Sequence, residues 1–205
     1  LDEVEDSFVG FTPAISLDSD WLRHALSAYV SVDHRQYSEL DDESRTNAKI
    51  KLRGRLDLGE NSSLTIEFAG ADETEDRTAL SNVATSLEPN EYTTASGRIG
   101  FDHQAGRVQI ATSLGLTSYD YDDTELAGEL FQDQDFRDRD ELIASARLGF
   151  AMTRDAAIYA QATHTEADYT PAGFFTAFNR DYSGSVLLVG TDFEFGERLR
   201  GELGV

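Results

Sequence analysis

The sequence has 205 residues, with 39 Asp and Glu against 17 Lys and Arg, which gives a formal net charge of −22. This acidity argues against a nucleic-acid partner, because phosphate binding requires a basic surface. The absence of cysteine excludes disulfides, thiolate catalysis and thiolate zinc sites. No apolar run approaches the roughly 18 residues of a transmembrane helix, whereas alternating transmembrane β-strands leave no such run.

Apolar and polar residues alternate along the whole chain. In the clearest stretch, residues 48–58, one face carries charged side chains and the other apolar ones. The charged residues are Lys49, Lys51, Arg53, Arg55 and Asp57. A period of two indicates a β-strand, because helical spacing would scatter the same residues around the axis. In chain order, we predict ten strands around residues 11–17, 26–32, 48–58, 64–68, 95–101, 108–116, 142–150, 158–162, 187–195 and 199–205.

The predicted connections alternate in length. Short turns are expected near residues 18–21, 59–63, 103–107, 153–156 and 196–198, and long polar segments at 33–45, 70–92, 118–141 and 164–182. Hairpins that are tight at one end and long at the other are typical of outer-membrane barrels. A hairpin centred near Asn61 would place Arg55 opposite Glu67. We therefore predict an all-β, antiparallel up-and-down transmembrane β-barrel; a β-propeller would need four short strands in each repeat.

Aromatic residues cluster at both ends of the predicted strands, as in the two interfacial girdles of a membrane barrel. Beside the short turns lie Trp21, Phe101, Phe150, Phe193 and Phe195. Beside the long segments lie Tyr37, Tyr92, Tyr119, Tyr169 and Tyr182.

The polar face of the strands carries full charges of both signs in mid-strand, which a hydrated barrel lumen explains. We predict that the lumen-facing charges are Lys49, Lys51, Arg53, Arg55, Glu67, Arg98, Arg147, Asp192, Glu194, Arg200 and Glu202. The solvent-exposed sheet face of a soluble β-sandwich would also alternate and carry charges, so a soluble acidic β-sandwich that binds carbohydrate stays open as an alternative.

The acidity is concentrated in the long segments. They hold 24 acidic and 6 basic residues, a net charge of −18 out of −22. Solubility and mutual repulsion of the loops explain this distribution. A second interpretation is divalent-cation binding, as a weak calcium site at Asp120, Asp122, Asp123 and Glu125 that would bridge to lipopolysaccharide. This stretch lacks the glycine and the distal glutamate of an EF-hand loop.

No motif points to catalysis. The sequence has neither a Gly-x-Ser-x-Gly elbow nor a phosphate-binding glycine loop. Its four histidines, His24, His34, His103 and His164, show no metal-ligand spacing. A site built from His34 or His164 with a loop aspartate is the one catalytic arrangement left to consider. We predict that the protein is not an enzyme and has no cofactor.

Several stretches resemble the putative β-barrel porin type 2 family of outer-membrane proteins. They are SDWLRHAL at 19–26, RTNA at 45–48, RGRLDLG at 53–59, YDYDD at 119–123, DRDE at 138–141, NRDYSG at 179–184 and LRGELGV at 199–205. Their order along nearly the whole chain is more specific than any one of them.

The resemblance implies a single barrel domain over residues 1–205 in the outer membrane of a Gram-negative, alphaproteobacterial cell. It also implies a chain that is incomplete at both ends, as part of a barrel of 12 or more strands. Its partners would be outer-membrane lipid and lipopolysaccharide. We expect a porin-like passive channel with a charged lumen. The alternative is a structural barrel whose acidic extracellular loops anchor surface polysaccharide, its export machinery or an appendage.

Overall fold

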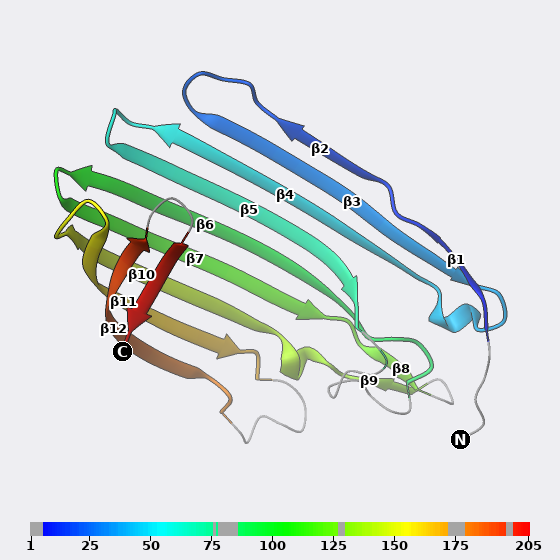
Figure 1. The fold of residues 1–205 in the computed structure, drawn as a ribbon. Coiled ribbons are helices and arrows are strands. Elements are labelled where there is room, and N and C mark those ends of the chain that lie inside the picture. The colour runs from blue at the N-terminus through cyan, green and yellow to red at the C-terminus, as the bar shows by residue number, and fades with distance from the viewer. Residues whose placement is uncertain (1–5, 76, 78–85, 127–129, 172–178, 196–198) are drawn as a thin grey trace.

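The computed structural model of the chain describes residues 6–75, 77, 86–126, 130–171, 179–195 and 199–205. These form one large antiparallel sheet and one small hairpin (Figure 1). The large sheet contains β1 (Phe8–Phe11), β2 (Ala14–Asp18), β3 (Ala25–Tyr37), β4 (Arg45–Asp57), β5 (Ser62–Thr74), β6 (Glu91–Ala105), β7 (Val108–Tyr121), β10 (Arg139–Ala151), β11 (Ala156–Tyr169), β12 (Tyr182–Phe195) and β13 (Leu199–Gly204). The hairpin pairs β8 (Thr124–Leu126) with β9 (Leu130–Gln132).

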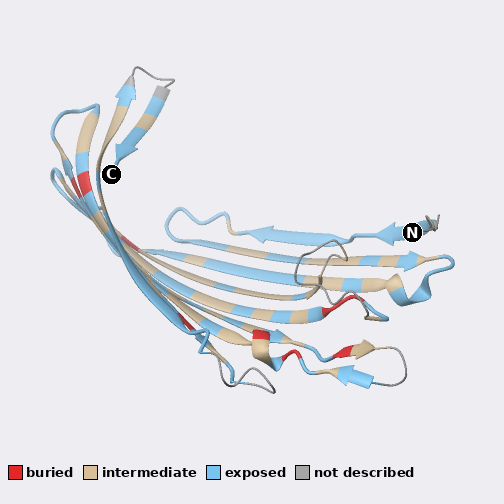
Figure 2. Ribbon diagram, turned by 90° about the horizontal axis from the view of Figure 1, so that it is seen from below, coloured by how far each residue is buried: buried red, intermediate tan, exposed pale blue. Residues whose placement is uncertain are grey.

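The sheet is an up-and-down meander. From β3 onward, strands that follow one another in the chain pair in the sheet, except that β7 pairs with β10 because the β8–β9 hairpin stands apart. The short strands β1 and β2 both pair with β3, so the described sheet has ten strand positions and confirms the predicted number and topology. It curls into an open trough, with β1 and β2 at one edge and β13 at the other (Figures 1 and 2).

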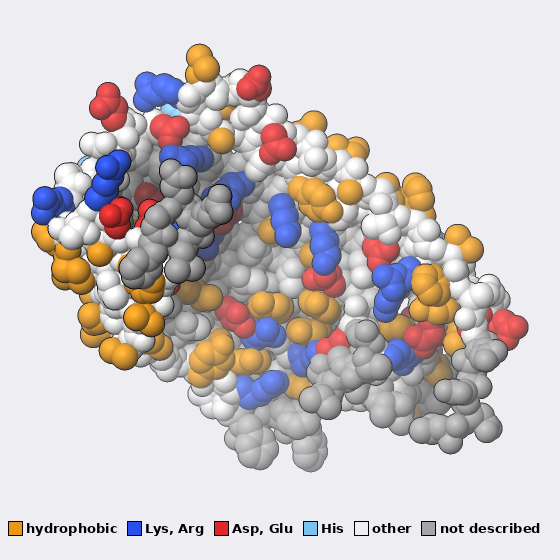
Figure 3. All heavy atoms as spheres, in the orientation of Figure 1, with side chains coloured by type: hydrophobic (Ala, Val, Ile, Leu, Met, Phe, Trp, Pro, Cys, Tyr) orange, Lys and Arg blue, Asp and Glu red, His pale blue; other side chains and the backbone are white. Residues whose placement is uncertain are grey.

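The two faces of the sheet differ in chemistry. The concave face is hollowed and carries Lys, Arg, Asp and Glu side chains (Figure 3), and one hollow on it has a volume of about 790 Å³. The other face carries exposed large apolar side chains, among them Ile50, Leu56, Ile99, Leu114 and Leu148. Among the described residues, buried apolar side chains are few: Pro89, Tyr159 and Ala167. The fold thus places its apolar surface outward, where a lipid bilayer would cover it.

The strands extend beyond the runs of alternating apolar residues. Most contain 13–15 residues, so the predicted long segments 70–92 and 118–141 begin and end inside strands. At these strand ends the pairing continues while the convex residues become polar, as at Asp72, Ser118 and Asp140. The strands therefore extend beyond the apolar band toward the long connections, and the predicted boundaries were wrong for this reason.

The predicted register of the hairpin near Asn61 was also wrong by one residue pair. Glu67 lies opposite Arg53, not Arg55, and Arg55 lies opposite Thr65. Gly59, at φ +148°, allows a tight turn in which the Leu58 amide donates to the Ser62 carbonyl over 2.9 Å. Opposite charges still meet across the two strands, as the sequence predicts.

The short turns lie at the predicted end of the sheet. Gly106, at φ +60°, closes the turn between β6 and β7, a backbone conformation that favours glycine. The first turn is longer than predicted and reaches His24, since the Ser19 amide donates to the Leu26 carbonyl over 2.8 Å. The predicted turn at 196–198 lies outside the described residues. The described part of the chain has no helix with the length and apolar character needed to span a membrane.

Candidate functional site

The register brings all eleven predicted lumen charges to the same face of the sheet. Arg53, Glu67 and Arg98 are successive partners across β4, β5 and β6, and alternation fixes the face of the other residues on these strands. The same face includes Lys49, Lys51 and Arg55 on β4, Arg147 on β10, Asp192 and Glu194 on β12, and Arg200 and Glu202 on β13. This is the concave face in Figure 3.

Most of these charges are paired. The Arg53 guanidinium lies 3.1 Å from the Glu67 carboxylate, and Lys49 pairs with Glu73. Arg55 pairs with Asp57 at 3.0 Å and Arg200 with Glu194 at 2.8 Å. The sequence places Asp57 on the charged face of its strand but not among the predicted lumen charges, and it does not single out Glu73. Glu73 is separated from Glu67 by an even number of residues on β5, which puts both on the same face. The pairs are partly exposed, so each contributes little to stability but fixes where charge lies on the face.

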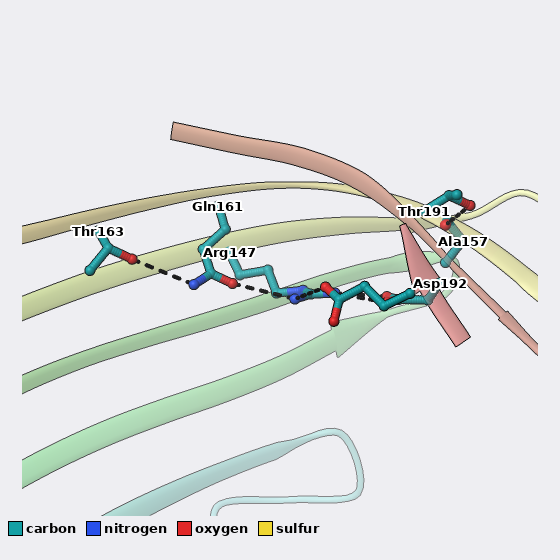
Figure 4. Close-up of polar contacts among 7 residues, drawn as sticks. Arg147, Ala157, Gln161, Thr163, Thr191 and Asp192 are labelled. Atoms are coloured by element: carbon teal, nitrogen blue, oxygen red, sulfur yellow. Dashed lines mark hydrogen bonds and ion pairs between the residues drawn. The ribbon is translucent and has the colours of Figure 1, made fainter. Parts of the chain in front are cut away.

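Arg147 is the centre of the densest polar network on this face (Figure 4). Its Nη2 donates to Asp192 at 2.8 Å, and its Nη1 lies 3.3 Å from both Glu202 and Gln161. The guanidinium also lies 3.5 Å from the ring centroid of Tyr159, which is 3% exposed. The network joins β10, β11, β12 and β13 near the short turns, where the sheet curls most strongly (Figure 2).

Two predicted lumen cations have no carboxylate partner among the described residues. Lys51 and Arg98 form none of the ion pairs of this face, and both side chains are exposed in the 790 Å³ hollow. Arg98 Nη2 donates to Ser113 Oγ over 3.1 Å, and Ser113 Oγ lies 2.9 Å from Ser145 Oγ. The middle of the concave face therefore combines a group of hydroxyls with two cations that form no ion pair among the described residues.

The predicted tyrosine girdle does not lie on the convex face. Residues separated by an even number of positions on a strand point to the same face, so Tyr92 lies on the concave face with Arg98, and Tyr119 with Ser113. We call this the concave parity, and the opposite one the convex parity. The same rule places Tyr37, Tyr169 and Tyr182 on the concave face. Arg139 lies 3.8 Å from the ring centroid of Tyr119 and 5.8 Å from that of Tyr169. Cation–π contacts of this kind hold the tyrosine rings among charged groups. The parity of each tyrosine along its strand was the signal for this placement.

The aromatic residues beside the short turns are placed differently. Phe101, Phe150 and Phe193 have the convex parity of the apolar residues around them. Trp21 lies in the first turn and is 59% exposed. Phe195 ends β12, and its side chain lies outside the described residues. An interfacial belt at this end of the sheet remains a prediction.

Sequence reasoning missed an ion pair at the end of the sheet that carries the long connections, which we call the rim. Arg137 donates to both carboxylate oxygens of Glu75, at 2.7 and 3.1 Å, and each side chain is only 11% exposed. The Arg137 guanidinium lies 3.9 Å from the ring centroid of Tyr121, and Asn90 Nδ2 also donates to Glu75. The two partners are 62 residues apart and both lie in segments without apolar periodicity, so no local pattern signals their contact.

The predicted calcium ligands are not brought together as a set. Of Asp120, Asp122, Asp123 and Glu125, only Asp123 belongs to a described carboxylate cluster, with Asp133 and Asp135, and all three are exposed. Asp133 raises the pKa of the Asp135 carboxyl through like-charge repulsion. Exposed acidic groups of this kind are what the −22 charge of the chain produces.

The described histidines pair mainly with neutral groups. His34 Nδ1 lies 2.8 Å from Thr46 Oγ1 and His164 Nδ1 lies 2.9 Å from Ser185 Oγ. Each contact joins neighbouring strands, and both histidines have convex parity. The structure thus gives these two candidates hydroxyl partners rather than the loop aspartates that catalysis would require.

Comparison with known proteins adds a family and a fold. A family model described as "Putative beta-barrel porin 2" matches residues 2–205. Among solved structures, the outer membrane channel DcaP of Acinetobacter baumannii is similar with a TM-score of 0.64 and 12% identity. The copper transporter OprC is similar with a TM-score of 0.55 and 9% identity. No curated protein matches the chain.

These likenesses cover nearly all of this chain but only part of each structure. The alignment with DcaP covers 93% of this chain and 54% of that one, and the alignment with OprC covers 96% and 36%. At identities this low they establish the fold alone. The fold is that of an outer-membrane β-barrel.

Proposed function

The chain belongs to the putative beta-barrel porin 2 family, and from this membership we propose that it forms a passive channel with a charged, water-filled lumen. The family and the channel-type neighbour point to the outer membrane of Gram-negative bacteria and to a role other than catalysis. The concave face would line the lumen, and the convex face would contact lipid.

The observation that carries this proposal is the segregation of charge by face. All eleven predicted charges share the concave face, while most of the exposed large apolar side chains of mid-strand, such as Ile99 and Leu114, share the other. Ile143 and Val186 are exceptions that lie on the concave face. A soluble sheet would cover its apolar face with a second layer, whereas a barrel in lipid leaves it exposed. The hydroxyls and ion pairs of the concave face are compatible with water and ions.

A second candidate function is a structural barrel that anchors a surface polymer or an appendage. The observation that favours it is an acidic cluster at the end of the sheet that carries the long connections. There the Glu75–Arg137 pair joins two of these connections, and the carboxylates of Asp123, Asp133 and Asp135 are exposed. A rim with this charge would bind a polymer through cations or basic groups rather than through its own charge.

Conductance distinguishes the two candidates. The full-length protein, extracted from outer membranes in mild detergent and added to a planar lipid bilayer, is expected to produce stepwise current increases. Insertion without current, verified by protease protection of the reconstituted barrel, would contradict the channel and support the anchoring function. A detergent-only sample and a boiled sample serve as controls for contaminating pores.

A further inference from the structure

We propose that the middle of the concave face is an anion-binding site that makes the lumen selective for small anions carrying carboxylate or phosphate groups. This inference rests on the proposed function, because it names the class of solute that the same lumen would favour. It starts from Lys51 and Arg98, the two predicted lumen cations that form no ion pair among the described residues.

The two cations lie close enough to act on one ion. Lys51 is opposite Ala69 and Arg98 is opposite Glu67, so they are two strands apart and two residues out of step. Strand spacings place their Cα atoms about 12 Å apart, and both side chains are long and exposed on the same side. They line the same hollow of about 790 Å³, which is large enough for an organic anion of several heavy atoms.

Arg98 retains most of its hydrogen-bonding capacity. A guanidinium has five N–H donors, and the described contacts of Arg98 use one of them, on Ser113 Oγ at 3.1 Å. Its side chain passes over Gly115, since a Cβ atom added to this glycine would lie 3.9 Å from Arg98 Cγ. The remaining donors suit the bidentate geometry of a carboxylate or phosphate.

Hydroxyl groups surround these two cations. Ser27, Ser96, Ser113, Thr117, Ser145 and Thr163 line the same hollow, and Ser113 and Ser145 share a hydrogen bond of 2.9 Å. Hydroxyls donate to anions without adding charge of their own. They would replace part of the water lost by an anion that enters the hollow.

Most carboxylates in and around the hollow are bound to cations other than Lys51 and Arg98. Glu67 is bound to Arg53 at 3.1 Å, and Glu141 to Arg139 at 2.7 Å. Asp18, on the edge strand β2, also lines the hollow and forms none of the described ion pairs. The charged residues that line the hollow balance, three cations (Lys51, Arg53 and Arg98) against three carboxylates (Asp18, Glu67 and Glu141). Arg139, which binds Glu141 from beside the hollow, brings the local sum to +1, and the two cations that form no ion pair stand on the side of the hollow that an anion would enter.

The test is ion selectivity of the full-length protein in planar bilayers under a KCl gradient. We expect chloride to permeate about 5 times better than potassium, a preference that falls to about 1 in the Lys51→Gln/Arg98→Gln variant. Arg107→Gln/Arg154→Gln removes the same charge from two short turns outside the hollow and should keep the preference. Lys51→Arg/Arg98→Lys should also keep it, because charge is conserved. Potassium selectivity, or a preference unchanged in Lys51→Gln/Arg98→Gln, would overturn the proposal.

A second measurement decides the site even for a barrel that carries no current. Inorganic phosphate and acetate, added separately to the detergent-solubilised protein, should raise the unfolding temperature of the native chain and of Arg107→Gln/Arg154→Gln. Neither anion should do so for Lys51→Gln/Arg98→Gln. A silent barrel with this anion dependence would contradict the channel and keep the site. Equal stabilisation of all variants would overturn the site whatever the conductance. The anion that raises the unfolding temperature of the native chain more shows whether the site prefers phosphate or carboxylate.

Discussion

Replacing Leu114 with Arg is expected to lower the free energy of unfolding in lipid vesicles by about 2–4 kcal/mol, the cost of a charge on the lipid face near the bilayer midplane. Leu114 lies at the centre of β7, between Ile99 and Ala144 on the convex face, and is 43% exposed. Urea unfolding of the protein refolded into vesicles measures the change.

Thr117→Arg is the matched control for this substitution. Thr117 is three residues further along β7 and has concave parity, so an arginine there would remain hydrated, and we expect a change of less than about 1 kcal/mol. A soluble sheet with both faces in water would tolerate both substitutions equally. Equal costs for the two arginines would therefore contradict the assignment of the convex face to lipid.

Replacing Arg137 with Met is expected to open the rim. The substitution would leave the nearly buried Glu75 carboxylate without its bidentate partner, at a cost of about 2 kcal/mol in local stability. Limited proteolysis of the rim in intact outer membranes should then be about 30 times faster, because cleavage follows the population of the locally opened state.

A double-mutant cycle isolates the Arg137–Glu75 pair. Glu75→Gln and Arg137→Met should each accelerate cleavage, and the double variant should be cleaved no faster than Arg137→Met alone. Arg180→Met serves as the control on the same rim, since Arg180 is exposed and donates to the Phe136 carbonyl over 2.6 Å. Additive effects of the two substitutions would mean that the pair does not hold the rim.

The middle part of each strand, where apolar and polar residues alternate, could be predicted because alternation is a local property of the sequence. The run from Lys49 to Arg55 determines which side chains share a face, whatever the strand pairs with. Register is less local, because it depends on the geometry of the turn. Gly59, at φ +148°, lies in a turn that is centred on Glu60 rather than on Asn61, and so Glu67 lies opposite Arg53 rather than Arg55.

The rim could not be predicted in the same way. Beyond the apolar band both faces of a strand are polar, so the sequence around Asp72 and Ser118 shows no alternation although the strands continue. The Glu75–Arg137 pair depends on how two long connections pack together. The tyrosines are an intermediate case, since the parity of Tyr92 and Tyr119 predicts their concave placement, whereas proximity to a strand end alone suggests a lipid interface.

The most direct test of the account uses the absence of cysteine in the chain. Single cysteines at positions 110–117 of β7, in the full-length protein in outer-membrane vesicles, would be labelled with a membrane-impermeant maleimide. We predict labelling with a period of two: Ala111, Ser113, Gly115 and Thr117 react through the aqueous lumen, and Ile110, Thr112, Leu114 and Leu116 are protected by lipid. Equal labelling at both parities, or protection at the odd positions, would contradict a barrel with a water-filled concave face.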